Sequence, residues 1–134
     1  MNSAIVLFAH GARDPEWAQP FEKMRAQIQA RVSDTPVMLA FLELMQPTLS
    51  DAISTLEKQG AQHLTLIPMF LARGGHLKND LPKLIAQIQA QHPTLTLHVS
   101  PAIGEVEAIL QHLSEWVLQE HLAIQTDKNL LHKG

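Results

Sequence analysis

The chain has 134 residues, of which 46% are hydrophobic and 17% are charged, and its formal net charge is −3. This length allows one domain, and the share of apolar residues excludes a disordered chain. The acidic balance and the low aromatic content, with no tyrosine, exclude a nucleic-acid-binding surface. Because there is no cysteine, disulfides, thiolate nucleophiles and cysteine-ligated metal clusters are excluded as well.

No apolar stretch approaches the length of about 20 residues that a membrane-spanning helix needs. The sequence enters an apolar run almost at once, without a basic flank or a small-residue cleavage site. We therefore expect a cytoplasmic protein that does not associate with membranes.

Strand and helix patterns alternate along the chain. Continuous apolar runs, typical of strands buried on both faces, occupy residues 4–9, 37–42, 64–71 and 95–99. Apolar residues at spacings of three and four predict helices over 17–32, 49–56, 81–88 and 106–117. We expect Thr48 to cap the second helix and Gly60 to end it. Asn79 or Asp80 is expected to cap the third helix, with Pro82 in its first turn.

This alternation predicts an α/β fold, because single helices between strands make right-handed crossovers and a parallel sheet. We expect one domain over residues 1–123, with a four-stranded parallel sheet in the order 2-1-3-4 and helices on both faces. Pro68 falls within the third strand and predicts a bulge or the end of strand pairing. Residues 124–134 are polar and aperiodic, and we expect them to fray.

Two histidines follow apolar runs and lie beside glycine. His10 ends the first run and precedes Gly11, and His76 follows Gly74 and Gly75 after the third run. Ligands of open α/β sheets bind beyond the carboxyl ends of the strands, and the first and third strands are expected to be neighbours. Both imidazoles would therefore reach one ion. Imidazole is a common metal ligand and a base near neutral pH, so an open metal or proton-transfer site is predicted.

Further polar groups are expected around this crevice. Glu43 follows the second strand and could be a third metal ligand or a proton acceptor, or a solvated residue. Arg13, Arg73 and Lys78 flank the histidine loops and indicate either an anionic ligand or ordinary surface charge, with equal weight. Gly74 and Gly75 would let the backbone approach a ligand closely.

Three segments resemble the short sirohydrochlorin chelatases of the CbiX/SirB type, within the class II chelatases. They are residues 7–15 (LFAHGARDP), 40–43 (AFLE) and 68–82 (PMFLARGGHLKNDLP). The resemblance follows the order and spacing of that family over about two-thirds of the chain. It implies insertion of cobalt or ferrous iron into a tetrapyrrole, without ATP, for cobalamin or sirohaem synthesis.

The resemblance also implies residue roles. His10 would be metal ligand and proton acceptor, His76 the second metal ligand, and Leu71, Ala72, Arg73, Gly74, Gly75 and His76 would line the macrocycle. Gln46 occupies a position linked to substrate contact that is commonly glutamate, and Ala12 one that is often serine. Residues 101–106 lack a histidine that the family tends to carry. The metal is a substrate, and no permanently bound cofactor is implied.

Alternative functions and an oligomeric state also follow from these features. A histidine phosphatase is disfavoured, because Ala9 stands where an arginine would clamp phosphate. A metal or tetrapyrrole carrier using the same two histidines is the second function considered. Larger relatives hold the macrocycle between two such domains, so a homodimer is expected, with Met69, Phe70 and Trp116 as candidate interface residues.

Overall fold

The computed structural model describes the backbone of residues 2–133 and the side chains of residues 2–127. Four strands form one parallel sheet in the order β2-β1-β3-β4, which confirms the predicted topology. The strands are β1 (Ser3–Ala9), β2 (Val37–Phe41), β3 (His63–Pro68) and β4 (Thr96–Val99). The α-helices are α1 (Gln19–Gln29), α2 (Leu49–Lys58), α3 (Gly75–Gln91) and α4 (Glu107–Lys133), with short 3-10 helices η1 (Pro15–Ala18) and η2 (Ile103–Glu105).

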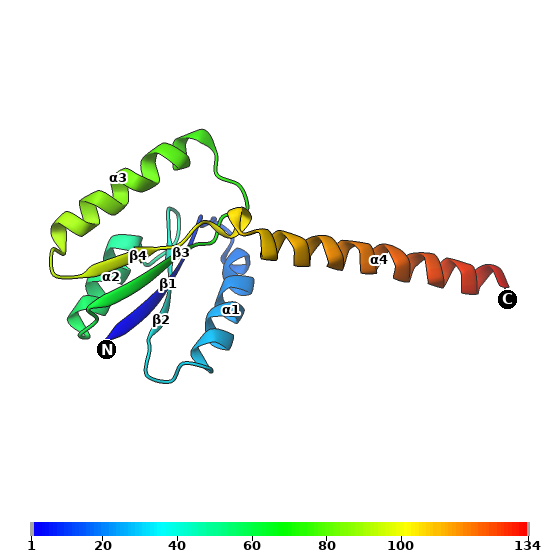
Figure 1. The fold of residues 1–134 in the computed structure, drawn as a ribbon, viewed down its shortest axis with the longest axis horizontal. Coiled ribbons are helices and arrows are strands. Elements are labelled where there is room, and N and C mark those ends of the chain that lie inside the picture. The colour runs from blue at the N-terminus through cyan, green and yellow to red at the C-terminus, as the bar shows by residue number, and fades with distance from the viewer. Residues whose placement is uncertain (1, 134) are drawn as a thin grey trace.

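Helices cover both faces of the sheet, but unequally (Figure 1). The larger core cluster joins the strands to α2 and α3 through Ile53, Leu56, Leu81 and Ile88. The smaller cluster, around Leu7, Leu39 and Phe41, packs against Trp17 of η1 and against residues of α1. Two helices therefore cover one face and one helix covers the other. Right-handed crossovers require this, because the crossover from β1 to β2 moves one way along the sheet and the later crossovers move the other way.

Several local predictions are confirmed. The Thr48 side chain accepts the Asp51 N–H at the start of α2, at 3.2 Å, and Gly60 follows the end of that helix with φ +101°. Pairing along β3 stops at Pro68, whose partner on β1 is Phe8. The strand accordingly ends there rather than at Leu71. The Met69 N–H still donates to the Phe8 carbonyl at 2.7 Å, so the last hydrogen bond to β1 lies one residue beyond Pro68.

The start of α3 was predicted wrongly. The helix begins at Gly75 after an N-cap at Gly74, not at Asn79 or Asp80, and Pro82 lies within it rather than in its first turn. Gly74 caps without a side-chain hydrogen bond. The sequence therefore carried no serine, threonine, aspartate or asparagine signal at the true boundary.

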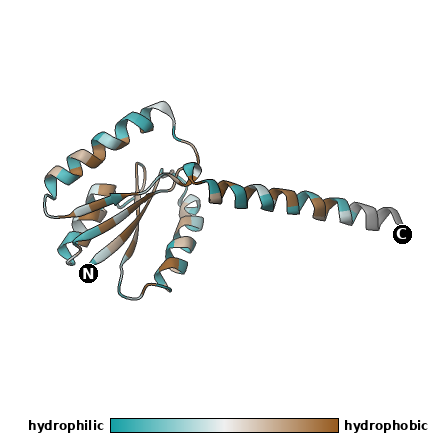
Figure 2. Ribbon diagram, viewed as in Figure 1, coloured by the Kyte–Doolittle hydropathy of each residue, from teal (hydrophilic) through white to brown (hydrophobic). Residues whose placement is uncertain are grey.

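Helix α4 leaves the α/β body and runs away from it (Figures 1 and 2). It continues through Ile124, where a frayed tail was expected, and stays helical to Lys133. The division of the chain at residue 123 remains a prediction. No helix in residues 2–133 is long and apolar enough to cross a bilayer.

Candidate functional site

The site lies at the carboxyl edge of the sheet, where β1 and β2 end side by side. His10 directly follows β1, and Glu43 lies two residues beyond β2. His10 Nε2 and Glu43 Oε1 are 3.0 Å apart, and both side chains are about half exposed. A carboxylate next to an imidazole orients the ring and strengthens it as a base or metal ligand. The sequence predicted only that these two residues follow the ends of the first two strands. The structure shows that their side chains are within hydrogen-bond distance.

The backbone fixes this pair. The N–H groups of Leu42 and Glu43 donate to the carbonyls of Ala9 and His10, at 2.9 and 3.1 Å. Gly11 has φ +96°, and a side-chain carbon there would overlap the Glu43 carbonyl oxygen. Only glycine fits a left-handed position packed this tightly. The two loops therefore approach each other because residue 11 has no side chain.

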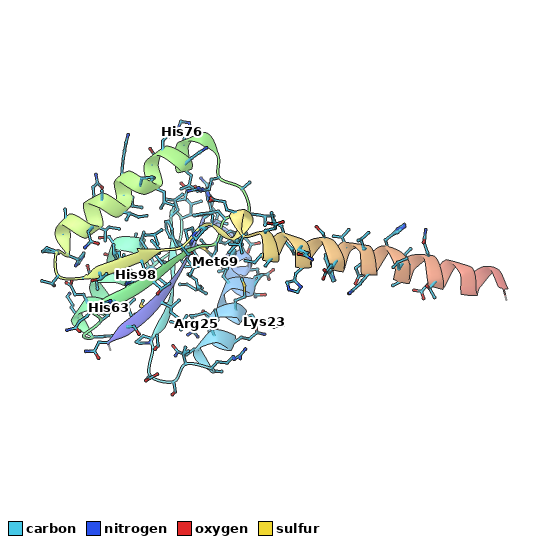
Figure 3. All side chains as sticks on the ribbon, in the orientation of Figure 1. Lys23, Arg25, His63, Met69, His76 and His98 are labelled. Atoms are coloured by element: carbon cyan, nitrogen blue, oxygen red, sulfur yellow. The ribbon has the colours of Figure 1, made fainter. Side chains whose placement is uncertain are left out.

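His76 lines the same cavity as this pair. It sits in the first turn of α3, at the end of that helix labelled in Figure 3. A cavity of 390 Å³ is lined by His10, Leu42, Glu43, Ala72, Gly74, Gly75, His76, Leu77 and Asp80. Six predicted site residues thus share one cavity. Leu42, Leu77 and Asp80 were not predicted; Asp80 follows His76 by four residues, a spacing that places both on one helix face.

The cavity is open, and its ligating groups are dispersed. Among the described residues, no three histidine, aspartate or glutamate side chains come close enough together to hold one metal ion. His10 and Glu43 form a pair, whereas His76 is not part of a cluster of three such side chains. This arrangement differs from a closed structural metal site, whose ligands surround the ion.

The start of α3 adds a backbone element to the cavity. Nothing lies within 4 Å of the positions where Gly74 and Gly75 would carry a Cβ. The first N–H groups of a helix have no partner within the helix and favour anions. Gly74 and Gly75 line the cavity, so the start of α3 forms part of its wall.

Four of the predicted substrate-binding residues lie outside the cavity lining. Leu71 is exposed beside it, at 59%, and Arg13 is exposed in the loop after β1. Arg73 forms an ion pair with Glu105 of η2. Gln46 lines a different cavity of 550 Å³ between α1 and β2, together with Arg25 and Met45. The substrate contacts assigned to these four residues remain predictions.

The Phe70 side chain lies next to the His10 ring. Its ring meets the ring of His10 edge-on, with centroids 6.4 Å apart, and that of Phe8 in the same way at 5.6 Å. It is buried in this chain's own core, so its expected place at an interface between copies was wrong. The burial of Phe70 instead gives the His10 ring a rigid support.

Comparison with known proteins places this geometry in a family. Residues 4–120 match the model of the CbiX family. The chain belongs to the CbiX family. It is 28% identical to sirohydrochlorin ferrochelatase of Bacillus subtilis (strain 168) over 83% of this chain and 42% of that one. It is 34% identical to sirohydrochlorin cobaltochelatase of Methanopyrus kandleri over 61% of this chain and 57% of that one.

Solved structures agree with the family assignment. A cobalamin (vitamin B12) biosynthesis CbiX protein from Marinobacter aquaeolei VT8 matches with a TM-score of 0.77 and 30% identity, over 90% of this chain and 98% of that one. The sirohydrochlorin chelatase SirB from Bacillus subtilis subspecies spizizenii, in complex with cobalt, matches with a TM-score of 0.69 and 31% identity. That match covers 80% of this chain and 46% of SirB. This chain therefore spans about half the length of the curated relatives it matches.

Proposed function

We propose that this chain is a sirohydrochlorin chelatase, which inserts cobalt or ferrous iron into a tetrapyrrole without ATP. The observation that carries the proposal is the His10–Glu43 pair, 3.0 Å apart at an open cavity that His76 also lines. Curated relatives named as sirohydrochlorin ferrochelatase and cobaltochelatase support the reaction type. Imidazole and carboxylate ligands suit both metals, so the proposal includes both.

The chemistry requires a base. Insertion exchanges one divalent ion for the two protons of the pyrrole N–H groups, and no oxidation state changes. An ionised Glu43 only accepts hydrogen bonds, so it favours the His10 tautomer with its proton on Nε2. The lone pair on Nδ1 is then free and accepts a pyrrole proton. The resulting imidazolium keeps its Nε2–H bonded to Glu43 and releases the Nδ1 proton to water, which frees Nδ1 for the second pyrrole proton.

His76 has a different role in this proposal. It lines the cavity from α3, on a different element from His10 and Glu43. A weakly held ion is easier to release into a macrocycle than one enclosed by four ligands. We assign His76 to metal delivery together with His10. The dispersed ligands therefore suit a metal that is substrate rather than resident cofactor.

The substrate is a polycarboxylate, and the cavity rim suits it. Arg13 and the N-terminus of α3 offer cationic or N–H groups to carboxylates. We assign Leu71, Ala72, Gly74 and Gly75 to contact with the ring, and Arg73 lies beside them in its ion pair with Glu105. A volume of 390 Å³ is near the small end of ligand sites, about 300–1,000 Å³. A wide macrocycle therefore needs a second wall, and we propose that a second copy of this chain supplies it in a homodimer.

The test is the rate of metal insertion into sirohydrochlorin, followed by absorbance, with Co²⁺ and with Fe²⁺ under anaerobic conditions. Acceleration above the uncatalysed rate at substoichiometric protein, with many turnovers, supports the proposal. The same two histidines could serve a carrier of metal or tetrapyrrole. Binding of either without faster insertion would favour the carrier and overturn the enzyme.

A further inference from the structure

Two histidines outside the cavity face each other on the sheet. His63 is the first residue of β3, and His98 is the third residue of β4. The Nδ1 atom of His63 lies 3.5 Å from the Nε2 atom of His98. The planes of the two rings are 13° apart and their centroids are separated by 5.8 Å (Figure 3). Each ring therefore presents a nitrogen atom to the other.

Strand pairing fixes this arrangement. His63 pairs in register with Thr96, and His98 follows two residues further along β4. Side chains two residues apart on a strand lie on the same face of the sheet, so both imidazoles share one face. Ser3, the partner of His63 on β1, places a hydroxyl group in the same row. His63 is half-buried and His98 is exposed, so solvent reaches the pair.

The separation of the two nitrogen atoms suits two bonds to one metal ion. Hydrogen bonds from N–H groups have heavy-atom distances of about 2.7–3.2 Å, so 3.5 Å allows only a weak one. Two zinc–nitrogen bonds of about 2.0–2.1 Å span 3.5 Å when the angle at the metal is roughly 115–120°, which is near the tetrahedral angle. Because His98 is exposed, its ring can turn and direct its lone pair to such an ion.

We propose that His63 and His98 form a second divalent-metal site, separate from the cavity that contains His10. The site takes an ion that nitrogen ligands favour, such as Co²⁺, Ni²⁺ or Zn²⁺. Among the described residues, no third histidine or carboxylate forms a cluster with the pair, so water molecules complete the coordination. Hydroxyl groups of Ser3 and Thr96, in register with His63, are placed to hydrogen-bond these waters. An ion with two protein ligands exchanges readily with solution.

The pair lies at the opposite edge of the sheet from the candidate active site. His63 begins β3, whereas the cavity lined by His10 and His76 lies beyond the carboxyl ends of the strands. A strand of the length of β3 extends about 20 Å. This distance excludes direct transfer of an ion from the pair into the macrocycle, so the second site is not a step of metal insertion.

The consequence of metal binding lies in the sheet itself. β4 is an edge strand of four residues, and three of them are exposed. An ion held by His63 and His98 bridges β3 and β4, so it binds only when the edge strand is paired. Binding to the folded state alone stabilises it by mass action. The site therefore makes the stability of this edge depend on the concentration of metal.

Calorimetric titration of the full chain with Zn²⁺ tests the site. The double variant His10→Ala with His76→Ala is the background, because it lacks the imidazoles of the cavity. In this background, His63→Ala with His98→Ala is expected to lower Zn²⁺ affinity about tenfold or more, since even the loss of a ligand's hydrogen-bond partner has an effect of that size. Absence of Zn²⁺ binding to the background variant would overturn the proposal.

A matched control removes two imidazoles elsewhere. His112→Ala with His121→Ala, in the same background, deletes two exposed histidines of α4 and is expected to leave Zn²⁺ affinity unchanged. Equal loss of affinity in this control and in the variant without His63 and His98 would overturn the proposal, because binding would then depend only on the number of histidines.

Thermal unfolding provides a second readout that needs no tetrapyrrole. Zn²⁺ at about a hundred times its dissociation constant is expected to raise the unfolding midpoint of the background variant by about 5 °C or more. The variant that also lacks His63 and His98 should show no such rise, and its midpoint without metal reports whether it folds. Equal rises in both variants would overturn the proposal. With His10 and His76 intact, the rate of metal insertion after His63→Ala and His98→Ala should equal that of the parent; a lower rate at unchanged stability would contradict the separation of the two sites.

Discussion

His10 Nε2 and Glu43 Oε1 lie 3.0 Å apart although 33 residues separate them in the chain. Parallel pairing of β1 with β2 causes this proximity, since Ala9 and Phe41 are partners at the last register position of the two strands. Each functional residue follows its strand within two positions. The pair therefore depends on strand register, which the hydrophobic cores on both faces of the sheet enforce.

Replacement of His10 by alanine is expected to lower the insertion rate by about 100-fold or more, the usual contribution of a positioned base. The side chain is half exposed, so its removal leaves no core cavity and the unfolding midpoint should stay near that of the parent. Insertion rate and thermal unfolding are measured together. His112→Ala, at a side chain that is 85% exposed on α4, is the matched control. Near-parental insertion by His10→Ala would contradict its role as base.

Replacement of His76 by alanine tests metal delivery separately from proton transfer. Because His76 lines the cavity from α3 but is not bonded to the His10–Glu43 pair, its loss should weaken Co²⁺ affinity and leave the base in place. We expect the metal concentration needed for half-maximal rate to rise about tenfold or more, with a smaller fall in the rate at saturating metal. An unchanged metal titration would remove His76 from the metal path.

Strand order, the buried stripes of α2 and α3 and the two loops of the site could be predicted from the sequence, because burial imposes its own periodicity on strands and helices. The start of α3 could not, because Gly74 caps by backbone conformation alone. The extent of α4 was missed for another reason. Its described side chains from Glu120 to Asp127 are exposed, so helix formers such as leucine, alanine and glutamine continue the helix there without an inward-facing pattern. The contact of Gly11 with Glu43 depends on two loops meeting, which no local pattern encodes.

Replacement of Gly11 by alanine should destabilise the fold strongly. The residue has φ +96°, and the added carbon would overlap the backbone oxygen of Glu43, so the two loops must separate. We expect a loss of about 2 kcal/mol or more in the free energy of unfolding, measured in urea. Gly75→Ala is the matched control, because nothing lies within 4 Å of its Cβ position and alanine favours the helix. Equal stability of the two variants would contradict the close packing at Gly11.

Replacement of Gln46 by glutamate tests whether that position contacts the substrate. Gln46 is exposed and lines the cavity beside α1 rather than the one that contains His10. We expect little change in stability and a shift in the relative rates for different macrocycles or metals, through a carboxylate placed near the end of β2. Gln19→Glu makes the same change elsewhere in that cavity and serves as control. Identical preferences in both variants would exclude Gln46 from substrate recognition.

Replacement of His92 by alanine should destabilise the chain without affecting the site. His92 is 8% exposed at the end of α3, and its Nδ1 lies 2.9 Å from Glu57 Oε1, while its Nε2 lies 3.4 Å from the Ser54 hydroxyl. The imidazole thus joins α3 to α2, and its removal leaves a small void and two polar groups without their partner. We expect a loss of about 1–3 kcal/mol in urea unfolding, the range for unpaired buried groups. The exposed His112→Ala should change stability by less than about 0.5 kcal/mol. Because His92 lies outside the His10 cavity, the insertion rate of the folded variant should match the parent; a loss of rate at unchanged stability would refute a purely structural role.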